Sequence, residues 1–244
     1  MKDLHTHILP GMDDGAKTVE ESLKMLRMER EQGVDTVALT PHFYRDRERP
    51  ERFLTRRRAS AEVLRDALMA LPEQERCSMP HLILGAEVAW VPNLPNMPEL
   101  LQMCMGDSKY LLLELPFSPW SDLMFRQIRE LMSKTGVTPV IAHLERYLSH
   151  QKPERVRELL ELDVLIQVSA TPMLHPLRRG KALGLLREHH AQIVATDCHD
   201  TVNRPPNLGV ASEVLLRKLG EKRWKECIRW ADDLASESLP DADT

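Results

Sequence analysis

The chain has 244 residues, a net charge of −4 and a pI near 6.2. This length fits one α/β barrel or two small domains, and the charge balance gives no general basic surface for nucleic acid. No window approaches eighteen apolar residues, and no charged segment precedes an apolar one at the N-terminus. We therefore expect neither a membrane span nor a signal peptide, and a cytoplasmic location. The four cysteines lack CxxC spacing, which argues against disulfides and a thiolate zinc site.

Apolar runs of strand length alternate with longer helical patterns along the whole chain, which predicts a parallel sheet built from βα units. Several runs are apolar enough for strands that are buried on both faces. The seven predicted strands are Lys2–His7, Thr36–His42, Leu82–Val88, Tyr110–Pro116, Pro139–Leu144, Val164–Ser169 and Gln192–His199. Because the sequence has no internal repeat and no linker, we expect one domain over residues 1–234 and an acidic flexible tail over 235–244.

Helical patterns fill the connections between these strands. The first helix begins at Thr18, which forms a capping box with Glu21, and it ends near Gly33. The remaining helices are predicted at about Glu51–Leu71, Met97–Met105, Ser121–Thr135, Pro153–Leu162, Leu177–His190, Gly209–Leu219 and Glu221–Leu234.

The second predicted helix begins inside an arginine-rich segment, Arg45–Arg58. This segment has seven arginines against three acidic residues, a net charge of +4 in a chain that is negative overall. Such a run is usually a solvated face. The alternative is a rim that attracts an acidic or phosphorylated ligand, and the sequence leaves both interpretations open.

The N-terminal strand carries His5 and His7, and the two-residue period of a strand places both imidazoles on one face. The turn that follows carries Asp13 and Asp14, whose carboxylates are able to reach back to the same point. For one such motif taken alone, a pair of ordinary histidines is the alternative.

Metal-competent side chains also lie at the ends of the other predicted strands, and in a parallel βα barrel these ends share one rim. Glu114 is a carboxylate within an apolar run, which costs free energy unless the charge is paired or bound to a cation. Each residue alone has an ordinary explanation in the core or at a helix cap. Together they predict a multinuclear metal centre formed by His5, His7, Asp14, His42, Glu87, Glu114, His143, Asp197 and His199.

This ligand set of imidazoles and carboxylates without thiolates suits Mn, Fe or Zn. Clustered divalent cations acidify a water molecule and clamp phosphoryl oxygens, so the pattern predicts metal-assisted phosphoester hydrolysis. Arg146 and Arg204 are candidates for binding the phosphate, with a surface arginine or an internal salt bridge as the alternative. An aryl phosphate is a reasonable substrate because a phenol, with a pKa of about 10, leaves readily. His175 is a candidate proton donor, or else an ordinary loop residue.

The motifs read, in chain order, DLHTHILPGMDDGAKT, ALTPHF, GAEV, LLLELP, VIAHLERY and ATDCHD followed by RPPNLG. They resemble the PHP (polymerase and histidinol phosphatase) superfamily and, more narrowly, its bacterial capsular-polysaccharide tyrosine-protein phosphatases. The resemblance covers Asp3 to about Gly209. It implies a single-domain, distorted (β/α)7 TIM-like barrel that removes phosphate from phosphotyrosine of a bacterial tyrosine kinase or related protein and so regulates exopolysaccharide and capsule synthesis.

The same resemblance implies three divalent cations, manganese first, with iron or zinc as alternatives. One metal would be held by His5, His7, Glu87 and Asp197; a second by Glu87 as a bridge with Glu114 and His143; and a third by Asp14, His42 and His199. Arg146 and Arg204 match the phosphate-binding arginines of the family. Small departures in AHLER and GAEV remove no ligand. We expect no nucleic acid partner and no membrane insertion, and no feature of the sequence indicates an oligomeric state.

A rival interpretation lies in Cys198–Arg204, which satisfies the C-x5-R pattern of cysteine-dependent tyrosine phosphatases. That loop needs a chain of inward-facing amides, usually with glycine, and this one has no glycine. The strand period also places Cys198 on the face opposite Asp197 and His199, so we expect the match to be a coincidence. Histidinol-phosphate phosphatase or another PHP phosphoesterase, and a non-catalytic phosphate-binding PHP module, are further alternatives.

Overall fold

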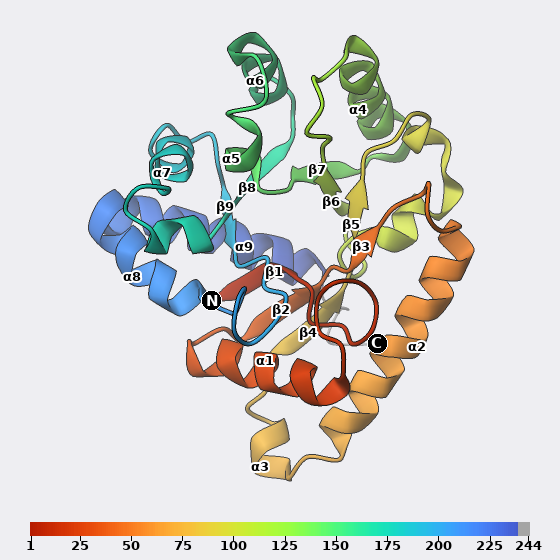
Figure 1. Ribbon diagram of the computed structural model, residues 1–244, viewed down its shortest axis with the longest axis vertical. Helices are drawn as coiled ribbons and strands as arrows, with labels where there is room; N and C mark the ends of the chain where they lie inside the picture. The colour runs from red at the N-terminus through yellow and green to blue at the C-terminus, as the bar shows by residue number, and fades with distance from the viewer. Residues whose placement is uncertain (239–244) are drawn as a thin grey trace.

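A computed structural model describes residues 1–238 of the chain. It is an α/β fold in which the helices surround a curled sheet, with α2 along one side and α8 along the other (Figure 1). Every pairing between neighbouring strands is parallel. The strands are β1 (Lys2–Thr6), β2 (Thr36–Leu39), β3 (His42–Phe43), β4 (His81–Leu84), β5 (Glu87–Ala89), β6 (Tyr110–Glu114), β7 (Thr138–Ile141), β8 (Leu165–Ser169) and β9 (Ile193–Ala195).

Two predicted strands are interrupted, so the prediction that they are continuous was wrong. The expected strand Thr36–His42 is divided into β2 and β3, and Leu82–Val88 is divided into β4 and β5. Pro41 lies at the first break and has no N–H to donate, and Gly85 lies at the second. Hydrogen bonding continues across the bend, since the Glu87 N–H donates to the Pro41 carbonyl at 3.1 Å. Each pair of short strands is thus a bent continuation of one chain path.

The strands form a three-stranded part in the order β1-β2-β4 and a six-stranded part in the order β3-β5-β6-β7-β8-β9. Beyond the end of β9 the chain returns to β1 through a parallel bridge between Thr6 and Cys198. The His7 N–H donates to the Cys198 carbonyl at 2.9 Å, and the Asp197 N–H donates to the His5 carbonyl at 2.8 Å. The first strand and the segment after the last strand therefore meet beside the histidine motif.

Most helices lie where the sequence predicts them. In α1, Thr18 caps the first turn by accepting the Glu21 N–H at 3.3 Å. The helices are α1 (Val19–Glu31), α2 (Pro50–Met69), α3 (Glu73–Arg76), α4 (Asp122–Thr135), α5 (Leu144–Tyr147), α6 (Pro153–Leu160), α7 (Gly180–Arg187), α8 (Leu208–Leu219) and α9 (Glu221–Ser238). Within the described part of the chain, no helix combines the length and the apolar character needed to cross a bilayer.

Three helical predictions are corrected. The segment Met97–Met105 forms a short 3-10 helix, Pro98–Met103, preceded by another at Leu94–Asn96. Pro98 has no N–H to donate to the preceding turn, so the two short helices do not join into one. The helix predicted from Leu177 begins at Gly180, because Leu177 is fully exposed and has no core to pack against. Residues 235–238 belong to α9 and not to the predicted tail. Residues 239–244 of that tail lie outside the described range.

The apolar core has two parts. The larger cluster fills the space between the sheet and the surrounding helices. The smaller one lies within the curl of the sheet, where Leu4, Ala38 and Leu112 pack with Leu234 from α9. This smaller cluster fills the interior of the curl with apolar side chains. The polar side chains of the strands gather at the carboxyl ends of the strands.

Candidate metal centre

Four predicted ligands from three distant segments meet at one point. The Nε2 atom of His5 lies 3.3 Å from Glu87 Oε2, 3.4 Å from Asp197 Oδ1 and 3.2 Å from His7 Nε2. The Nε2 atom of His7 lies 3.4 Å from the same Glu87 oxygen and 3.3 Å from the same Asp197 oxygen. All four residues are at most 2% exposed. The bulge in β1 between Asp3 and Thr6 accompanies this convergence of His5 and His7.

These distances fit a small cation. His5 Nε2, His7 Nε2 and Glu87 Oε2 are 3.2–3.4 Å apart, so one point lies at about 2.0 Å from all three atoms, which is the usual distance from zinc to an imidazole nitrogen. The Nδ1 atom of His143 and the Nε2 atom of His199 are buried and have no hydrogen-bond partner within the described residues, whereas the buried Glu87 Oε2 lies 2.8 Å from His42 Nδ1. A buried polar atom without a partner is costly, and a cation beside His199 Nε2 would satisfy it.

The other predicted ligands lie around this cluster. The Nε2 atom of His143 is 3.0 Å from Glu87 Oε1 and 3.9 Å from Glu114 Oε1. Glu114, on β6, and His42 contribute atoms to a second group with Glu87, whose ligand atoms all lie within 4.8 Å of one another. Glu87 therefore stands between two groups, in the position of a bridging carboxylate.

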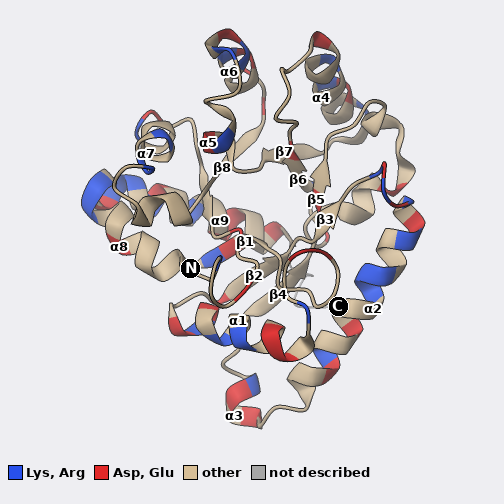
Figure 2. Cartoon of the chain, viewed as in Figure 1, with Lys and Arg blue, Asp and Glu red and all other residues tan. Residues whose placement is uncertain are grey.

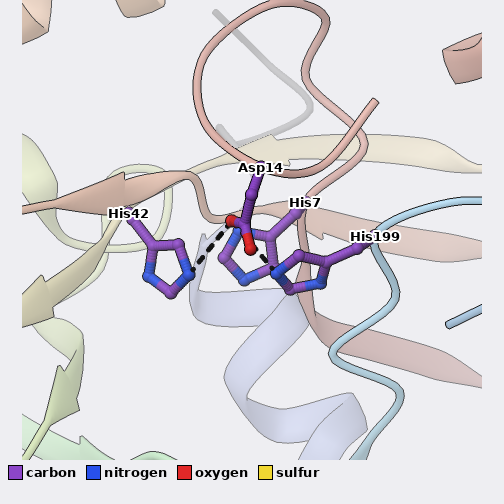
Figure 3. Close-up of side chains that lie close together, drawn as sticks. All are labelled: His7, Asp14, His42 and His199. Carbon is purple, nitrogen blue, oxygen red and sulfur yellow. Dashed lines mark ion pairs between the residues drawn. The ribbon is translucent and has the colours of Figure 1, made fainter. Parts of the chain in front are cut away.

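A third group faces the solvent. Asp14 Oδ1 lies 3.6 Å from His42 Nε2 and 3.4 Å from His199 Nε2. Figure 3 shows Asp14 descending from the loop after β1 toward these two rings, with His7 beside them. The Asp14 side chain is 66% exposed, whereas that of His199 is 4% exposed. The structure thus brings all nine predicted ligands into one centre that is open on its Asp14 side.

The electrostatics of the centre favour positive charge. Burial lowers the pKa of His5, but the charges of Glu87 and Asp197 outweigh it, so the net shift is upward. Burial raises the pKa of Glu87, but His5 and other nearby imidazoles hold that pKa well below its ordinary value. For Glu114, burial and the charge of Glu87 raise the pKa. Without a metal, protons on imidazoles balance the carboxylates; a divalent cation would supply the same charge and leave the imidazoles neutral.

Two of the four non-glycine residues with positive φ in the described chain are predicted ligands. His143 has φ of 36° and Asp197 has φ of 53°, both in the left-handed region that non-glycine residues seldom adopt. His143 directly follows β7 and Ala142, and Asp197 lies two residues beyond β9. Strain of this kind persists where the surroundings fix the residue, and it is concentrated at functional sites.

Two residues that sequence reasoning did not assign hold the ligands in place. Asp13 Oδ2 lies 2.7 Å from His7 Nδ1 and also accepts the His42 N–H at 2.8 Å. Gln167 Oε1 lies 3.2 Å from His5 Nδ1 and accepts the His143 N–H at 2.7 Å. Such contacts fix the ring orientation of ligating histidines. The position of Asp13 beside Asp14 in the turn is the sequence feature that could have indicated its role. Nothing in the local sequence indicates the role of Gln167.

The loop after β1 lies directly on the centre because Gly15 allows a close approach. A Cβ atom at this position would overlap the His7 carbonyl oxygen, and the Ala16 N–H donates to that oxygen at 2.9 Å. The Gly15 N–H donates to Asp13 Oδ1 at 2.9 Å. The turn thus presents Asp13 to His7 and leaves Asp14 on the open side.

The two predicted arginines lie at the edge of the centre. Both Arg146 Nη2 and Arg204 Nη2 donate to Asp197 Oδ2, at 2.7 Å for Arg204, while the other oxygen of Asp197 faces His5 and His7. Arg146 also reaches Ser169 Oγ at 3.2 Å. The two side chains are 37% and 39% exposed, so they are accessible to a ligand at the rim.

The cysteine interpretation does not match the geometry. Cys198 is 1% exposed, and its Sγ lies 3.7 Å from Glu29 Oε1, on the side of α1. Burial, together with the nearby charges of Glu29 and Asp3, raises the pKa of this thiol well above its ordinary value. A buried protonated thiol is inert as a nucleophile. The candidate proton donor, His175, is exposed at the end of the 3-10 helix Thr171–Leu174.

A sequence profile described as "Capsular polysaccharide synthesis, CpsB/CapC" matches residues 1–232. The chain belongs to the CpsB/CapC family. Among its relatives, the tyrosine-protein phosphatase CpsB of Streptococcus pneumoniae is 31% identical over 93% of this chain and 94% of that protein. The tyrosine-protein phosphatase YwqE of Bacillus subtilis (strain 168) is 28% identical over 91% of this chain and 86% of its own length.

A solved structure supports the same grouping within the CpsB/CapC family. It comes from work on YwqE from Bacillus subtilis and CpsB from Streptococcus pneumoniae, which describes them as unique metal-dependent tyrosine phosphatases. The TM-score is 0.84 at 26% identity, covering 98% of this chain and 96% of that one. The α/β fold with its curled parallel sheet is therefore shared with a metal-dependent phosphatase.

Proposed function

We propose that this chain is a metal-dependent protein-tyrosine phosphatase that hydrolyses phosphotyrosine on a bacterial tyrosine kinase or related protein and thereby regulates exopolysaccharide and capsule synthesis. The names of its CpsB/CapC relatives and of its structural neighbour support the reaction. The observation that carries the proposal is the convergence of His5, His7, Glu87 and Asp197 on one point with spacings of 3.2–3.4 Å for the five pairs measured.

The proposed centre holds three divalent cations, manganese first, with iron or zinc as alternatives. The ligands would be His5, His7, Glu87 and Asp197 for the first, Glu87, Glu114 and His143 for the second, and Asp14, His42 and His199 for the third. The proximity of His143 to both Glu87 and Glu114 supports the second set, and that of Asp14 to both His42 and His199 supports the third.

Bound cations of this kind acidify water and neutralise phosphoryl oxygens. The chain's own residues supply the rest. Arg146 and Arg204 have exposed donors at the rim and would hold the non-bridging oxygens of the phosphate. Asp13 and Gln167 keep the histidine rings oriented through hydrogen bonds. The tyrosine phenol leaves readily because its pKa is about 10, so little help from a general acid is needed.

The order of strand pairing supports a closed barrel. If each bent pair of short strands is counted as one, the pairings run from β1 through β2/β3, β4/β5, β6, β7 and β8 to β9, and the bridge between Thr6 and Cys198 leads back to β1. We propose that this is a distorted (β/α)7 barrel forming a single domain that extends past the predicted boundary at residue 234 to the end of α9 at Ser238. Its mouth would carry the metal centre, and a cytoplasmic location would give access to a kinase.

The test compares a phosphotyrosine peptide with histidinol phosphate, using manganese-loaded and chelated protein. The proposal expects metal-dependent release of phosphate from the peptide at a higher kcat/KM than from histidinol phosphate. A preference for histidinol phosphate would assign the chain to alkyl phosphate chemistry. No release from either compound by the loaded protein would indicate a non-catalytic phosphate-binding module.

A further inference from the structure

A cavity of about 600 Å³ opens beside the metal centre and joins two surfaces of opposite charge. One wall carries Asp14 and His42, both predicted metal ligands. The other carries Arg47, Arg52 and Arg56 from the arginine-rich segment. Figure 2 shows the acidic residues on the loop after β1 and the basic residues on the connection from β3 and along the first half of α2. A ligand that reaches the centre from this side passes the arginines.

The basic wall has more positive charge than its own carboxylate neutralises. Glu48 Oε2 pairs with Arg56 Nη1 at 2.6 Å, and Glu48 Oε1 lies 3.4 Å from Arg52 Nε. Three guanidinium groups against this one carboxylate leave two positive charges on the wall. The Arg52 side chain is 78% exposed, so its hydrogen-bond donors are open to a ligand.

Arg47 is held by an aromatic ring. Its guanidinium carbon lies 4.5 Å from the centre of the Tyr44 ring, a contact that favours a cation over the ring face. Within residues 1–238 no carboxylate lies within ion-pair distance of Arg47. Tyr44 in turn places its hydroxyl 3.2 Å from His42 Nδ1. One residue thus links an unpaired guanidinium to the metal centre.

Arg57 belongs to the same segment but is buried, so the basic wall is not simply a consequence of composition. Arg57 is 8% exposed and donates to the Gly85 carbonyl at 2.8 Å and to the Gln102 carbonyl at 2.7 Å. Burial lowers its pKa to about 10. Arg57 therefore ties α2 to the chain that leads into β5, whereas Arg47 and Arg52 have no comparable structural contacts.

We infer that this cavity is a second recognition subsite, in which Arg47 and Arg52 bind a carboxylate side chain that flanks the phosphorylated tyrosine. The inference rests on the proposed function and specifies its substrate: phosphotyrosine within an acidic stretch of polypeptide. Arg146 and Arg204 on the far side of the centre take the phosphate, and the basic wall takes the flanking charge. Guanidinium groups suit this role because they bind carboxylates with two parallel hydrogen bonds.

The experiment measures kcat/KM on two phosphotyrosine peptides that differ only at the three positions on each side of the tyrosine, which are glutamate in one and glutamine in the other. Manganese-loaded wild type is compared with R47Q/R52Q. The matched control is R65Q/R58Q, which removes the same charge from α2 outside this cavity. We expect the acidic peptide to be preferred by about tenfold in wild type and in the control, since two surface charge pairs contribute this much. In R47Q/R52Q the ratio should fall to about one.

A second readout is salt. The preference should decrease between low and high ionic strength, because exposed charges are screened over a Debye length of about 8 Å at physiological salt. Equal hydrolysis of both peptides by wild type, or an unchanged ratio in R47Q/R52Q, would overturn the subsite and leave the phosphatase in place. No hydrolysis of either peptide would overturn the proposed function and the subsite with it.

Discussion

Two clusters of buried carboxylates lie beside β1, and their negative charge is neutralised in different ways. In the first, Asp3 and Glu29 are both 0% exposed and meet Cys198 and Thr196 between β1 and α1. No basic side chain is paired with either carboxylate among residues 1–238, and burial raises the pKa of both. In the second, Glu87 and Asp197 are surrounded by imidazoles and guanidinium groups, and their pKa values are well below the ordinary range.

The two clusters differ in the neighbours of the buried acids and not in the burial itself. A buried pair of acids without cations keeps a proton, because the neutral form of a carboxyl group has a lower free energy than the charged form in an apolar environment. The Asp3 side chain serves the fold, since it accepts the Thr196 N–H at 3.0 Å and so joins β1 to the chain that carries Asp197. Imidazoles converge on the carboxylates of the second cluster from other segments, and this is the feature on which the proposed metal centre depends.

The largest effect should come from removing the bridging charge. Glu87→Gln keeps the shape of the side chain but loses a ligand shared by two groups, and we expect kcat/KM to fall by about 10³-fold or more. The metal content, measured by elemental analysis, should fall in parallel. Full activity in this variant would show that Glu87 only fills space.

Chelation should destabilise the protein as well as inactivate it. One cation at a hundred times its Kd stabilises the folded state by about 2.7 kcal/mol, and 1 kcal/mol shifts the Tm of a chain this long by about 2–4 °C. Calorimetry should therefore show a Tm at least about 5 °C lower after chelation, restored by manganese. An unchanged Tm would count against a centre that couples metal binding to folding.

Arg204→Ala should reduce turnover without releasing metal. Removing one donor to the charged phosphoryl group costs about 10²-fold in kcat, while the first metal group keeps its ligands. The control is Arg155→Ala, which removes an arginine paired with Asp122 at the surface. Unaltered turnover in Arg204→Ala would exclude that arginine from the reaction.

Asp13→Asn should weaken metal binding by about 10–100-fold, because the carboxylate that orients His7 is lost. Titration calorimetry with manganese measures the change. Asp122→Asn, at an exposed carboxylate on α4, is the matched control. If the two variants bind manganese equally, the contact between Asp13 and His7 has no influence on the centre.

The smallest effect is expected in the cluster of Asp3 and Glu29. Glu29→Gln replaces a carboxyl group that already retains its proton, so stability should change by less than about 1 kcal/mol and kcat/KM by less than about twofold. The same substitution at Glu87 is the matched comparison. A loss of metal in Glu29→Gln would show that the two clusters act together.

Sequence alone indicates much of the fold because its signals are local. Alternation along Lys2–His7 and the capping of α1 by Thr18 depend on residues that are neighbours in the chain, so the amino-acid order is enough to infer both. The breaks at Pro41 and Gly85 were missed because an apolar run of this length looks continuous, although a proline inside it is a warning.

Some residues of the site could likewise be predicted from the sequence, and others could not. The predicted ligands stand at the ends of strands, where a general rule of parallel sheets brings them together. Gln167 was missed because it reaches His5 across 162 residues of sequence, and no local pattern carries that contact. The sequence also does not show which arginines of the arginine-rich segment are buried. That depends on which side of α2 packs against the rest of the protein, and the structure shows that Arg57 is buried and Arg52 is exposed.

The most direct test is anomalous scattering from crystals soaked in manganese. We expect a peak between His5, His7, Glu87 and Asp197, at about 2.0–2.2 Å from the four ligand atoms, and further peaks beside Glu114 and Asp14. A manganese-soaked crystal with no peak among these side chains would contradict the proposed metal centre.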